Sequence, residues 1–271
     1  MPYDISYPDD TYILSESATI IYGDSGIGKT TISRTMPKPL FLIMRGGGEH
    51  RPMPLVGSGI PFIEIQTKPQ LDEILLDLRH GLTVKIQKTA KDISSAVAKM
   101  ADGNLLEEYR PQTIIFDQLT SMYDVYMANI LKMVSRKRDT PETPNMQDYG
   151  QARRQFTNYL IEANQIPNIH KVYLSLAEMD EDEATKERYG APMIPGKLAR
   201  EVLRLMDFVF RMHTRREVRG GKLTEFRCFQ TAHEGIWLAK DSSGKLPKPF
   251  IEIPDSNFDF WNEVMMPCLT K

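Results

Sequence analysis

Short apolar runs and helical periodicities alternate through the first two thirds of the chain. Apolar residues three and four apart predict helices at 29–36, 70–79, 119–133 and 147–164. The runs between them are rich in β-branched and aromatic residues, which is typical of buried strands; they lie at 19–22, 40–44, 61–65, 113–117 and 171–176. Because strands that alternate with helices form parallel sheets, this order predicts an α/β fold with a mainly parallel sheet flanked by helices.

The apolar period changes to two near residue 207. Phe208, Phe210 and Met212 then share one face of a predicted strand, and the residues between them share the other. The segment 219–222, Arg-Gly-Gly-Lys, predicts a hairpin turn into a second strand at 224–231. The C-terminal third is therefore expected to add antiparallel strands to the parallel core.

No repeat, low-complexity tract or long linker divides the chain, so a single domain over residues 1–271 is predicted. The charged, glycine-containing segment 178–196 predicts a long mobile loop, and the proline-containing segment 135–145 a second loop. The remaining subdivisions are an N-terminal lead-in at 1–18, an insertion at 82–110 with one helix near 92–100, an antiparallel extension at 207–254 and a C-terminal tail at 255–271.

The composition is that of a globular protein, with 34 lysines and arginines against 36 aspartates and glutamates and 41% hydrophobic residues. A net charge of -2 confines any nucleic-acid binding to local basic patches. Cys228 and Cys268 are too few for a disulfide framework or a cysteine-rich zinc site. The sequence has no apolar stretch of membrane-spanning length and no signal-peptide pattern, so we expect a soluble, cytoplasmic protein without a membrane partner.

One segment carries a specific chemical motif. GDSGIGKT at 23–30 matches G-x-x-x-x-G-K-[ST] between a predicted strand and a predicted helix. Backbone N–H groups of such a loop point toward phosphates, Lys29 would reach the β- and γ-phosphates, and Thr30 would bind Mg²⁺. A structural glycine-rich turn is the alternative. The expected nucleotide contacts are Gly23, Asp24, Ser25, Gly26, Ile27, Gly28, Lys29, Thr30 and Thr31.

Asp117 ends the apolar run at 113–117, in the position of a Walker B carboxylate that holds Mg²⁺ through water. The alternative is an N-cap for the helix that starts at Leu119. The phosphate-loop motif favours the metal role, so Thr30 and Asp117 are the predicted metal-binding pair, with ATP and Mg²⁺ as the ligands.

The order of these parts resembles the RecA-like branch of the P-loop NTPases, and more closely a phage-type RecA-like ATPase family associated with single-strand annealing and recombination. The resemblance covers most of the chain. It implies a Mg²⁺-dependent ATPase that assembles into a ring or filament and acts on single-stranded DNA in phage recombination or replication, by annealing or strand exchange. It also implies the host cytoplasm and a single-strand-binding protein as a further partner. Its carriers are GDSGIGKT, PLFLIMRGGGEH, TIIFDQLTS, QDYGQARRQF, VYLSLAEMDED, APMIPGKLAREVLRLMDFVFRM and IWLAKDSSGKLPKP.

The resemblance further implies roles for three residues. Glu49 is the candidate for the glutamate that activates the attacking water, although related phage proteins read Asp-Thr-Glu-Gly-Gly where this chain reads Met-Arg-Gly-Gly-Gly, which favours slow hydrolysis. Glu178 matches a position that senses the γ-phosphate. Lys240 resembles a cation that RecA-like assemblies insert into a neighbour's ATP site. Plainer alternatives are loop surface for the two glutamates and the flank of a turn for Lys240.

The predicted hairpin favours nucleic acid, because its first strand and turn carry five lysines and arginines and one acid between 211 and 222. A basic face neutralises phosphates without reading sequence, which suits single strands. A solvated charged hairpin is the alternative. The predicted DNA contacts are Arg211, His213, Arg215, Arg216, Arg219 and Lys222.

Two other functions are compatible with a phosphate loop. One is a P-loop kinase for a small phosphate acceptor, which would close an arginine-rich lid; the comparable stretch, 181–188, has four acids and two cations. The other is a nucleotide-gated interaction protein with little turnover, which the missing carboxylate near Gly46 would permit.

Overall fold

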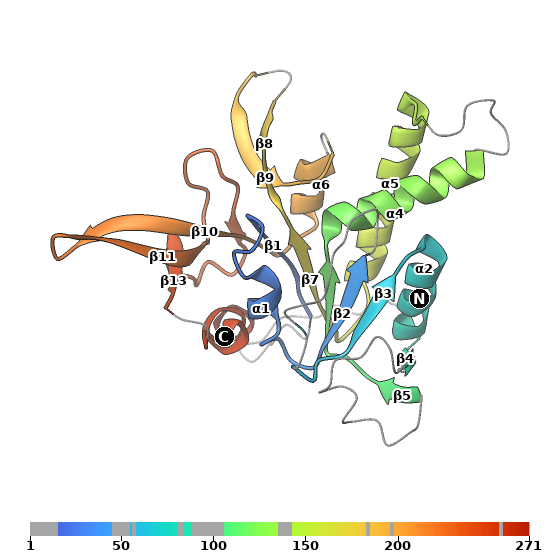
Figure 1. Cartoon of the computed structure of the whole chain (residues 1–271), viewed down its shortest axis with the longest axis horizontal. Helices are drawn as coiled ribbons and strands as arrows, with labels where there is room; N and C mark the ends of the chain where they lie inside the picture. The colour runs from blue at the N-terminus through green and yellow to red at the C-terminus, as the bar shows by residue number, and fades with distance from the viewer. Residues whose placement is uncertain are drawn as a thin grey trace, which may run out of the picture.

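The computed structural model describes residues 16–44, 55, 58–80, 84–87, 106–134, 143–182, 185–195, 198–254 and 257–270. Its centre is a nine-stranded sheet in the order β13-β11-β10-β1-β7-β6-β2-β3, with β12 paired to β10 (Figure 1). The strands are β1 (Ala18–Gly23), β2 (Pro39–Met44), β3 (Phe62–Ile65), β6 (Thr113–Asp117), β7 (His170–Ser175), β10 (Phe208–Arg219), β11 (Lys222–Gln230), β12 (Lys240–Asp241) and β13 (Phe250–Ile253).

Neighbouring strands from β10 to β3 run parallel. Their carboxyl ends therefore meet at one edge of the sheet, where α/β proteins bind their ligands. β7 lies between β1 and β6, so the end of β1 and Asp117 at the end of β6 are separated by one strand. The predicted class, a mainly parallel sheet flanked by helices with antiparallel strands from the C-terminal part, is confirmed.

Helices cover both faces of the sheet and build two hydrophobic cores. Because successive strand residues point to opposite faces, Ile20 packs with α2, α4, α5 and α6, whereas Ile21 packs with α1 and the C-terminal helices. None of the described helices is long and apolar enough to span a membrane. The helices are α1 (Lys29–Ser33), α2 (Lys68–Arg79), α4 (Leu119–Val134), α5 (Met146–Asn164), α6 (Leu198–Arg204), the π-helical η3 (Trp261–Met265) and α7 (Met266–Leu269).

Two helix ends show how local chemistry sets the boundaries. α1 ends at Ser33, earlier than the predicted Met36, because the next three backbone N–H groups donate to carbonyls three residues back, at 3.2–3.3 Å, in tighter turns. α5 begins close to its predicted start. Asn145 caps it by accepting from the backbone N–H of Asp148 at 3.0 Å, and the Asp148 carboxylate accepts from the Asn145 N–H at 2.9 Å.

The predicted insertion at 82–110 contributes a small antiparallel pair, β4 (Val84–Gln87) with β5 (Leu106–Tyr109). The helix predicted near 92–100 lies outside the described residues. The loop predicted at 135–145 is described only from residue 143.

The prediction of a long loop at 178–196 is wrong for most of its length. β8 (Ala177–Glu181) and β9 (Arg188–Pro192) form an antiparallel hairpin that projects from the sheet (Figure 1). Gly190 anchors it, because its N–H donates to the Ile236 carbonyl at 2.7 Å and its carbonyl accepts from the Leu238 N–H at 3.0 Å. Most β8 side chains are exposed, so the strand carries no apolar period that the sequence could reveal.

We expect Gly190→Ala to destabilise the protein. A Cβ at Gly190 would lie 2.0–2.4 Å from three ring atoms of Trp237, so the indole must move, at a cost of about 1–3 kcal/mol. The control is Gly150→Ala in α5, where a Cβ meets nothing within 4 Å and alanine should add about 0.5–1 kcal/mol. Urea unfolding should give effects of opposite sign, and a Gly190→Ala variant as stable as the parent would contradict the packing of Trp237 on Gly190.

β10 changes partner along its length. Residues 208–212 pair parallel with β1, and residues 211–219 pair antiparallel with β11. Gly220 and Gly221 turn the hairpin with φ of 57° and 79°, the left-handed region that a two-residue hairpin turn requires. The ribbon, as we call the β10–β11 hairpin, projects from the body as an arm (Figure 1). The predicted alternation is confirmed, because Phe208 and Phe210 are buried in one core.

Stability should depend on pH through a buried histidine at the start of β7. His170 Nδ1 lies 3.1 Å from the Ser17 Oγ, and its ring meets Trp261 edge to face. Burial, and then the Lys171 ammonium, lower the pKa of His170 to about 4. Between about pH 6.5 and pH 4 the unfolded chain therefore binds a proton that the folded chain does not, so the free energy of unfolding decreases as the pH is lowered through that window, by roughly 2–3 kcal/mol.

His170→Gln, which has no titrating ring, should lose this part of the acid sensitivity. His233→Gln, at an exposed histidine, should keep it. Urea unfolding at several pH values between 7 and 4 measures the slopes, and a His170→Gln slope as steep as the parent's would exclude the assignment.

Candidate functional site

The phosphate-loop motif lies at the end of β1, against β10. Gly26 and Gly28 have φ of 75° and 108°, which only glycine adopts readily. Gly23 needs the absence of a Cβ for another reason, since one there would lie 2.2 Å from the Met212 carbonyl oxygen on β10. The three glycines therefore let the backbone turn tightly beside the sheet, as a phosphate-binding loop requires.

Lys29 is the first residue of α1 and is only 8% exposed. Its Nζ donates to the carbonyl oxygens of Gly23 and Asp24, at 2.8 Å each. Burial lowers the pKa of Lys29, and the carboxylates of Asp117 and Asp24 oppose that shift. The ammonium thus lies inside the loop on neutral acceptors, where an anion would be a stronger partner.

Thr30 and Asp117 meet although 87 residues separate them in the chain. The Thr30 hydroxyl donates to Asp117 Oδ2 at 2.9 Å, and Asp117 is 2% exposed. The parallel register of β1, β7 and β6 brings them together, because it places the ends of β1 and β6 at the same edge. This is the pair that the sequence predicted for Mg²⁺.

The donor set fits magnesium. Mg²⁺ is usually bound by one or two protein oxygens together with phosphate oxygens and waters. The Thr30 hydroxyl and the Asp117 carboxylate, beside the phosphate loop, would supply these protein oxygens. Elsewhere in the described part of the chain, no group of three or more His, Cys, Asp or Glu residues could hold a metal ion.

Of the three residues whose roles the family resemblance implies, the structure describes two. Glu49 lies outside the described residues. Glu178 is exposed on β8, beyond the end of β7, the strand next to the phosphate-loop strand. Lys240 is exposed on β12, and its Nζ donates to the Met206 carbonyl at 2.7 Å.

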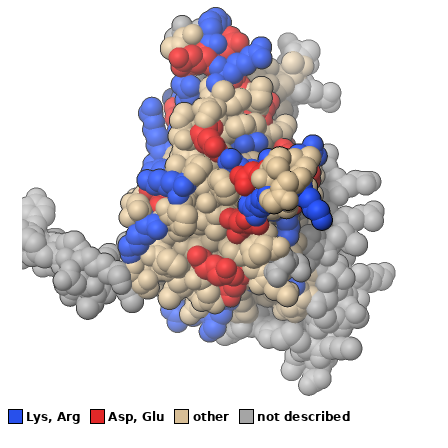
Figure 2. All heavy atoms as spheres, turned by 90° about the vertical axis from the view of Figure 1, so that its left-hand side faces the viewer, with Lys and Arg blue, Asp and Glu red and all other residues tan. Residues whose placement is uncertain are grey.

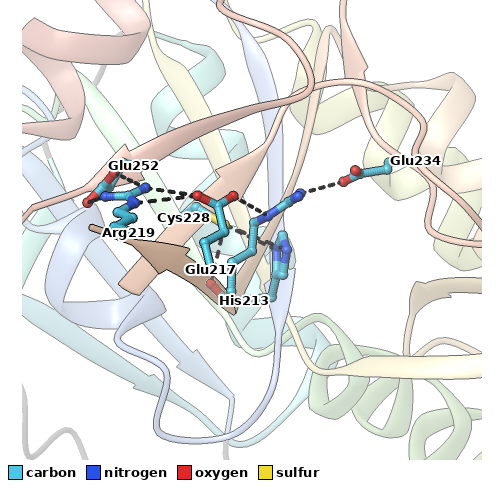
Figure 3. Close-up of polar contacts among 7 residues, drawn as sticks. His213, Glu217, Arg219, Cys228, Glu234 and Glu252 are labelled. Atoms are coloured by element: carbon cyan, nitrogen blue, oxygen red, sulfur yellow. Dashed lines mark hydrogen bonds and ion pairs between the residues drawn. The ribbon is translucent and has the colours of Figure 1, made fainter. Parts of the chain in front are cut away.

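Three ribbon arginines form ion pairs with glutamates, so the ribbon does not present an uninterrupted basic face. Figure 3 shows the carboxylates of Glu217, Glu234 and Glu252 among them, and Figure 2 shows acidic and basic side chains intermixed at this end of the molecule. The closest ion-pair distances are 2.8 Å for Arg215 with Glu234, 2.6 Å for Arg216 with Glu225 and 2.9 Å for Arg219 with Glu252.

Two other predicted DNA contacts pack against neighbouring side chains. The Arg211 guanidinium lies 3.6 Å from the centre of the Trp237 ring. His213 is buried, 3.6 Å from the Cys228 thiol, and burial followed by the nearby Arg211 charge lowers its pKa, so it is a neutral ring at pH 7 (Figure 3). Burial raises the pKa of Cys228 to about 12, which keeps it an unreactive thiol. His213 is therefore shielded from solvent, and Arg211 is half-buried against Trp237.

Sequence reasoning missed Arg227 and Trp237 at this site. Arg227 on β11 reaches the phosphate loop, where its Nη1 donates to the Ile27 carbonyl at 3.3 Å. Trp237 joins the β8–β9 hairpin at Gly190 to Arg211 on the ribbon. Alternation along β11 puts Arg227 on one face of a strand, but only the register with β10 shows that this face is turned to the loop.

A family model described as an AAA domain matches residues 16–243, which is most of the chain and includes the loop, Asp117 and the ribbon. The chain belongs to this AAA-domain family. Membership of this family supports nucleotide binding at the phosphate loop. Comparison with curated proteins gave no match.

Two solved structures are similar to this AAA domain over most of their length. A KaiC-like protein from the hyperthermophilic archaeon Pyrococcus horikoshii OT3 is 11% identical, with 88% of this chain and 89% of that chain covered and a TM-score of 0.35. The RadB recombinase is 11% identical, with 81% and 89% covered and a TM-score of 0.37.

Proposed function

We propose that this AAA domain is an ATP-binding, RecA-like ATPase that binds single-stranded DNA and assists phage recombination or replication, by annealing or strand exchange. The observation that carries the nucleotide part is the meeting of Lys29, Thr30 and Asp117 at the carboxyl ends of β1 and β6. The order of sequence motifs supports the DNA part.

The residues of the loop would act by charge and position. The Lys29 ammonium would exchange two neutral carbonyl acceptors for phosphate oxygens, which are stronger partners. Thr30 and Asp117 would hold Mg²⁺, and the bound ion would neutralise charge on the phosphate oxygens. Glu49 and Glu178 remain the proposed water-activating and γ-phosphate-sensing carboxylates.

The outer half of the ribbon is the proposed DNA contact. Arg216, Arg219 and Lys222 lie near its turn and are exposed, whereas Arg211 is half-buried and His213 is buried. Because glutamates pair with Arg216 and Arg219, DNA phosphates would have to displace carboxylates there, which favours weak, salt-sensitive binding over tight binding.

The deciding experiment measures the ATPase rate with and without single-stranded DNA, together with light scattering of the same samples. We expect stimulation by DNA and larger assemblies with ATP. A P-loop kinase would show neither response, and a nucleotide-gated interaction protein would assemble with almost no turnover, so each alternative has its own outcome.

Assembly as a ring or filament is part of the proposal, with Lys240 as the cation that enters a neighbour's site. Lys240 pairs with Val209 of β10, and Val209 pairs with Ile20 of β1. Lys240 is therefore two strands away from β1, at the level of Ile20, and Ile20 comes three residues before Gly23. That places it on the order of 10 Å from its own phosphate loop both along and across the strands. An exposed lysine at this distance is better placed for a neighbouring copy than for its own nucleotide.

Mixing inactive variants tests this role. Lys240→Ala and Lys29→Ala should each be inactive alone, and mixed assemblies should regain part of the ATPase activity, because some interfaces then combine an intact loop with an intact Lys240. Absence of recovery, with both variants folded and assembled, would remove Lys240 from the proposal.

A further inference from the structure

Arg227 lies on the face of the ribbon that is turned toward the phosphate loop. It pairs with Thr214 on β10, two residues beyond Met212, which itself pairs with Gly23 at the start of the loop. Side chains at alternate positions share a face, so Arg227 extends on the same side as Met212, the side on which α1 packs.

The guanidinium of Arg227 rests on the loop backbone. Nη1 donates to the Ile27 carbonyl oxygen at 3.3 Å, and the same nitrogen would lie 2.9 Å from a Cβ at Gly28. Gly28 has a φ of 108°, which glycine adopts most readily, and a side chain there would also displace the end of the Arg227 side chain. Lys29 follows Gly28 directly, so the Lys29 ammonium and the Arg227 guanidinium both contact carbonyl oxygens of the same loop.

Arg227 differs from the other ribbon arginines in its partners. Within the described part of the chain, its one polar contact is the Ile27 carbonyl, and no carboxylate or aromatic ring accompanies it. A guanidinium stays charged at any physiological pH and has five N–H donors in a planar fork that matches phosphate. By contrast, a glutamate or an aromatic ring contacts each of Arg211, Arg215, Arg216 and Arg219.

We propose that Arg227 is a nucleotide-binding residue, which contacts the phosphates of a nucleoside di- or triphosphate held by the phosphate loop of its own chain. The proposal rests on the nucleotide site proposed above. It assigns to β11 a cation that acts within one chain, in distinction from Lys240, which would act between chains. The same contact would tie the ribbon to the occupied loop.

Calorimetric titration with MgADP and with inorganic pyrophosphate tests the contact. We expect Arg227→Gln to weaken both ligands tenfold or more, the loss of about one charge-assisted hydrogen bond. Pyrophosphate matters because it has phosphates without a base or ribose. The matched control is Arg154→Gln, at an exposed arginine of α5, which packs on the other face of the sheet from α1 and should bind both ligands like the parent.

The outcomes separate this inference from the nucleotide site itself. If the parent binds no MgADP, or if Lys29→Ala binds it equally well, the proposed nucleotide site fails. If Lys29→Ala loses binding but Arg227→Gln stays within twofold of the parent, or if Arg154→Gln loses as much, only the role of Arg227 is overturned. Should Arg227→Gln not fold, Arg227→Lys decides: it keeps the charge but not the fork, so weaker MgADP binding supports the contact and parent-like binding overturns it.

Discussion

Lys29→Ala should bind MgATP on the order of a hundredfold more weakly than the parent, or fail to turn it over. The ammonium is buried inside the loop, and removing one partner of a desolvated charge pair typically costs about 2–5 kcal/mol of binding. Titration calorimetry and a steady-state ATPase assay measure the two quantities.

The same substitution should leave the empty protein as stable as the parent, or more stable. Burial already lowers the pKa of Lys29, which means that the charged form is held at a cost when only carbonyls face it. Binding and stability should therefore move in opposite directions. Lys186→Ala, at an exposed lysine in the β8–β9 turn, is the control and should change neither. Parent-like turnover by Lys29→Ala would sink the nucleotide-site assignment.

Asp117→Asn should reduce Mg²⁺-dependent turnover about a hundredfold or more while affecting ATP affinity measured without Mg²⁺ much less. The amide oxygen of asparagine can still accept the hydrogen bond from Thr30, so the local structure should persist. What is lost is the negative charge that holds the metal, and the metal stabilises charge chiefly in the transition state.

Rates measured across a series of Mg²⁺ concentrations check this prediction. A weakened metal site should show a higher Mg²⁺ requirement as well as a lower maximal rate. Glu73→Gln, at an exposed carboxylate on α2, should reproduce the parent curve. If Asp117→Asn also did so, Asp117 would be reduced to a structural partner of Thr30.

Features that depend only on residues close together in the sequence were predictable from it. The motif 23–30 places three glycines and Lys29 within one turn of the chain, so its loop conformation follows from local backbone freedom. The apolar run that ends in Asp117, the alternation after residue 207 and the turn at Gly220 and Gly221 are local in the same sense. Local patterns of this kind predicted most strands of the central sheet, most of the helices and the nucleotide-site candidates.

The neutralisation of the ribbon was decided by tertiary structure. The cations between 211 and 222 are conspicuous in the sequence, but the carboxylates that pair with them include Glu234 and Glu252, from segments that reach the ribbon only through sheet pairing. A count of cations along the sequence therefore overestimated the positive charge on the ribbon surface.

Sheet order and register decided the rest. The insertion of β7 between β1 and β6 sets where Thr30 meets Asp117, and the register of β11 on β10 carries Arg227 to Ile27, 200 residues away in the chain. Likewise, the exposed β8 became a strand because Gly190 lets Trp237 pack on β9. The sequence by itself determined most strands of the central sheet and the loop that can bind an anion. Contacts between strands depend on long-range pairing that no local pattern encodes, and only the folded chain decides them.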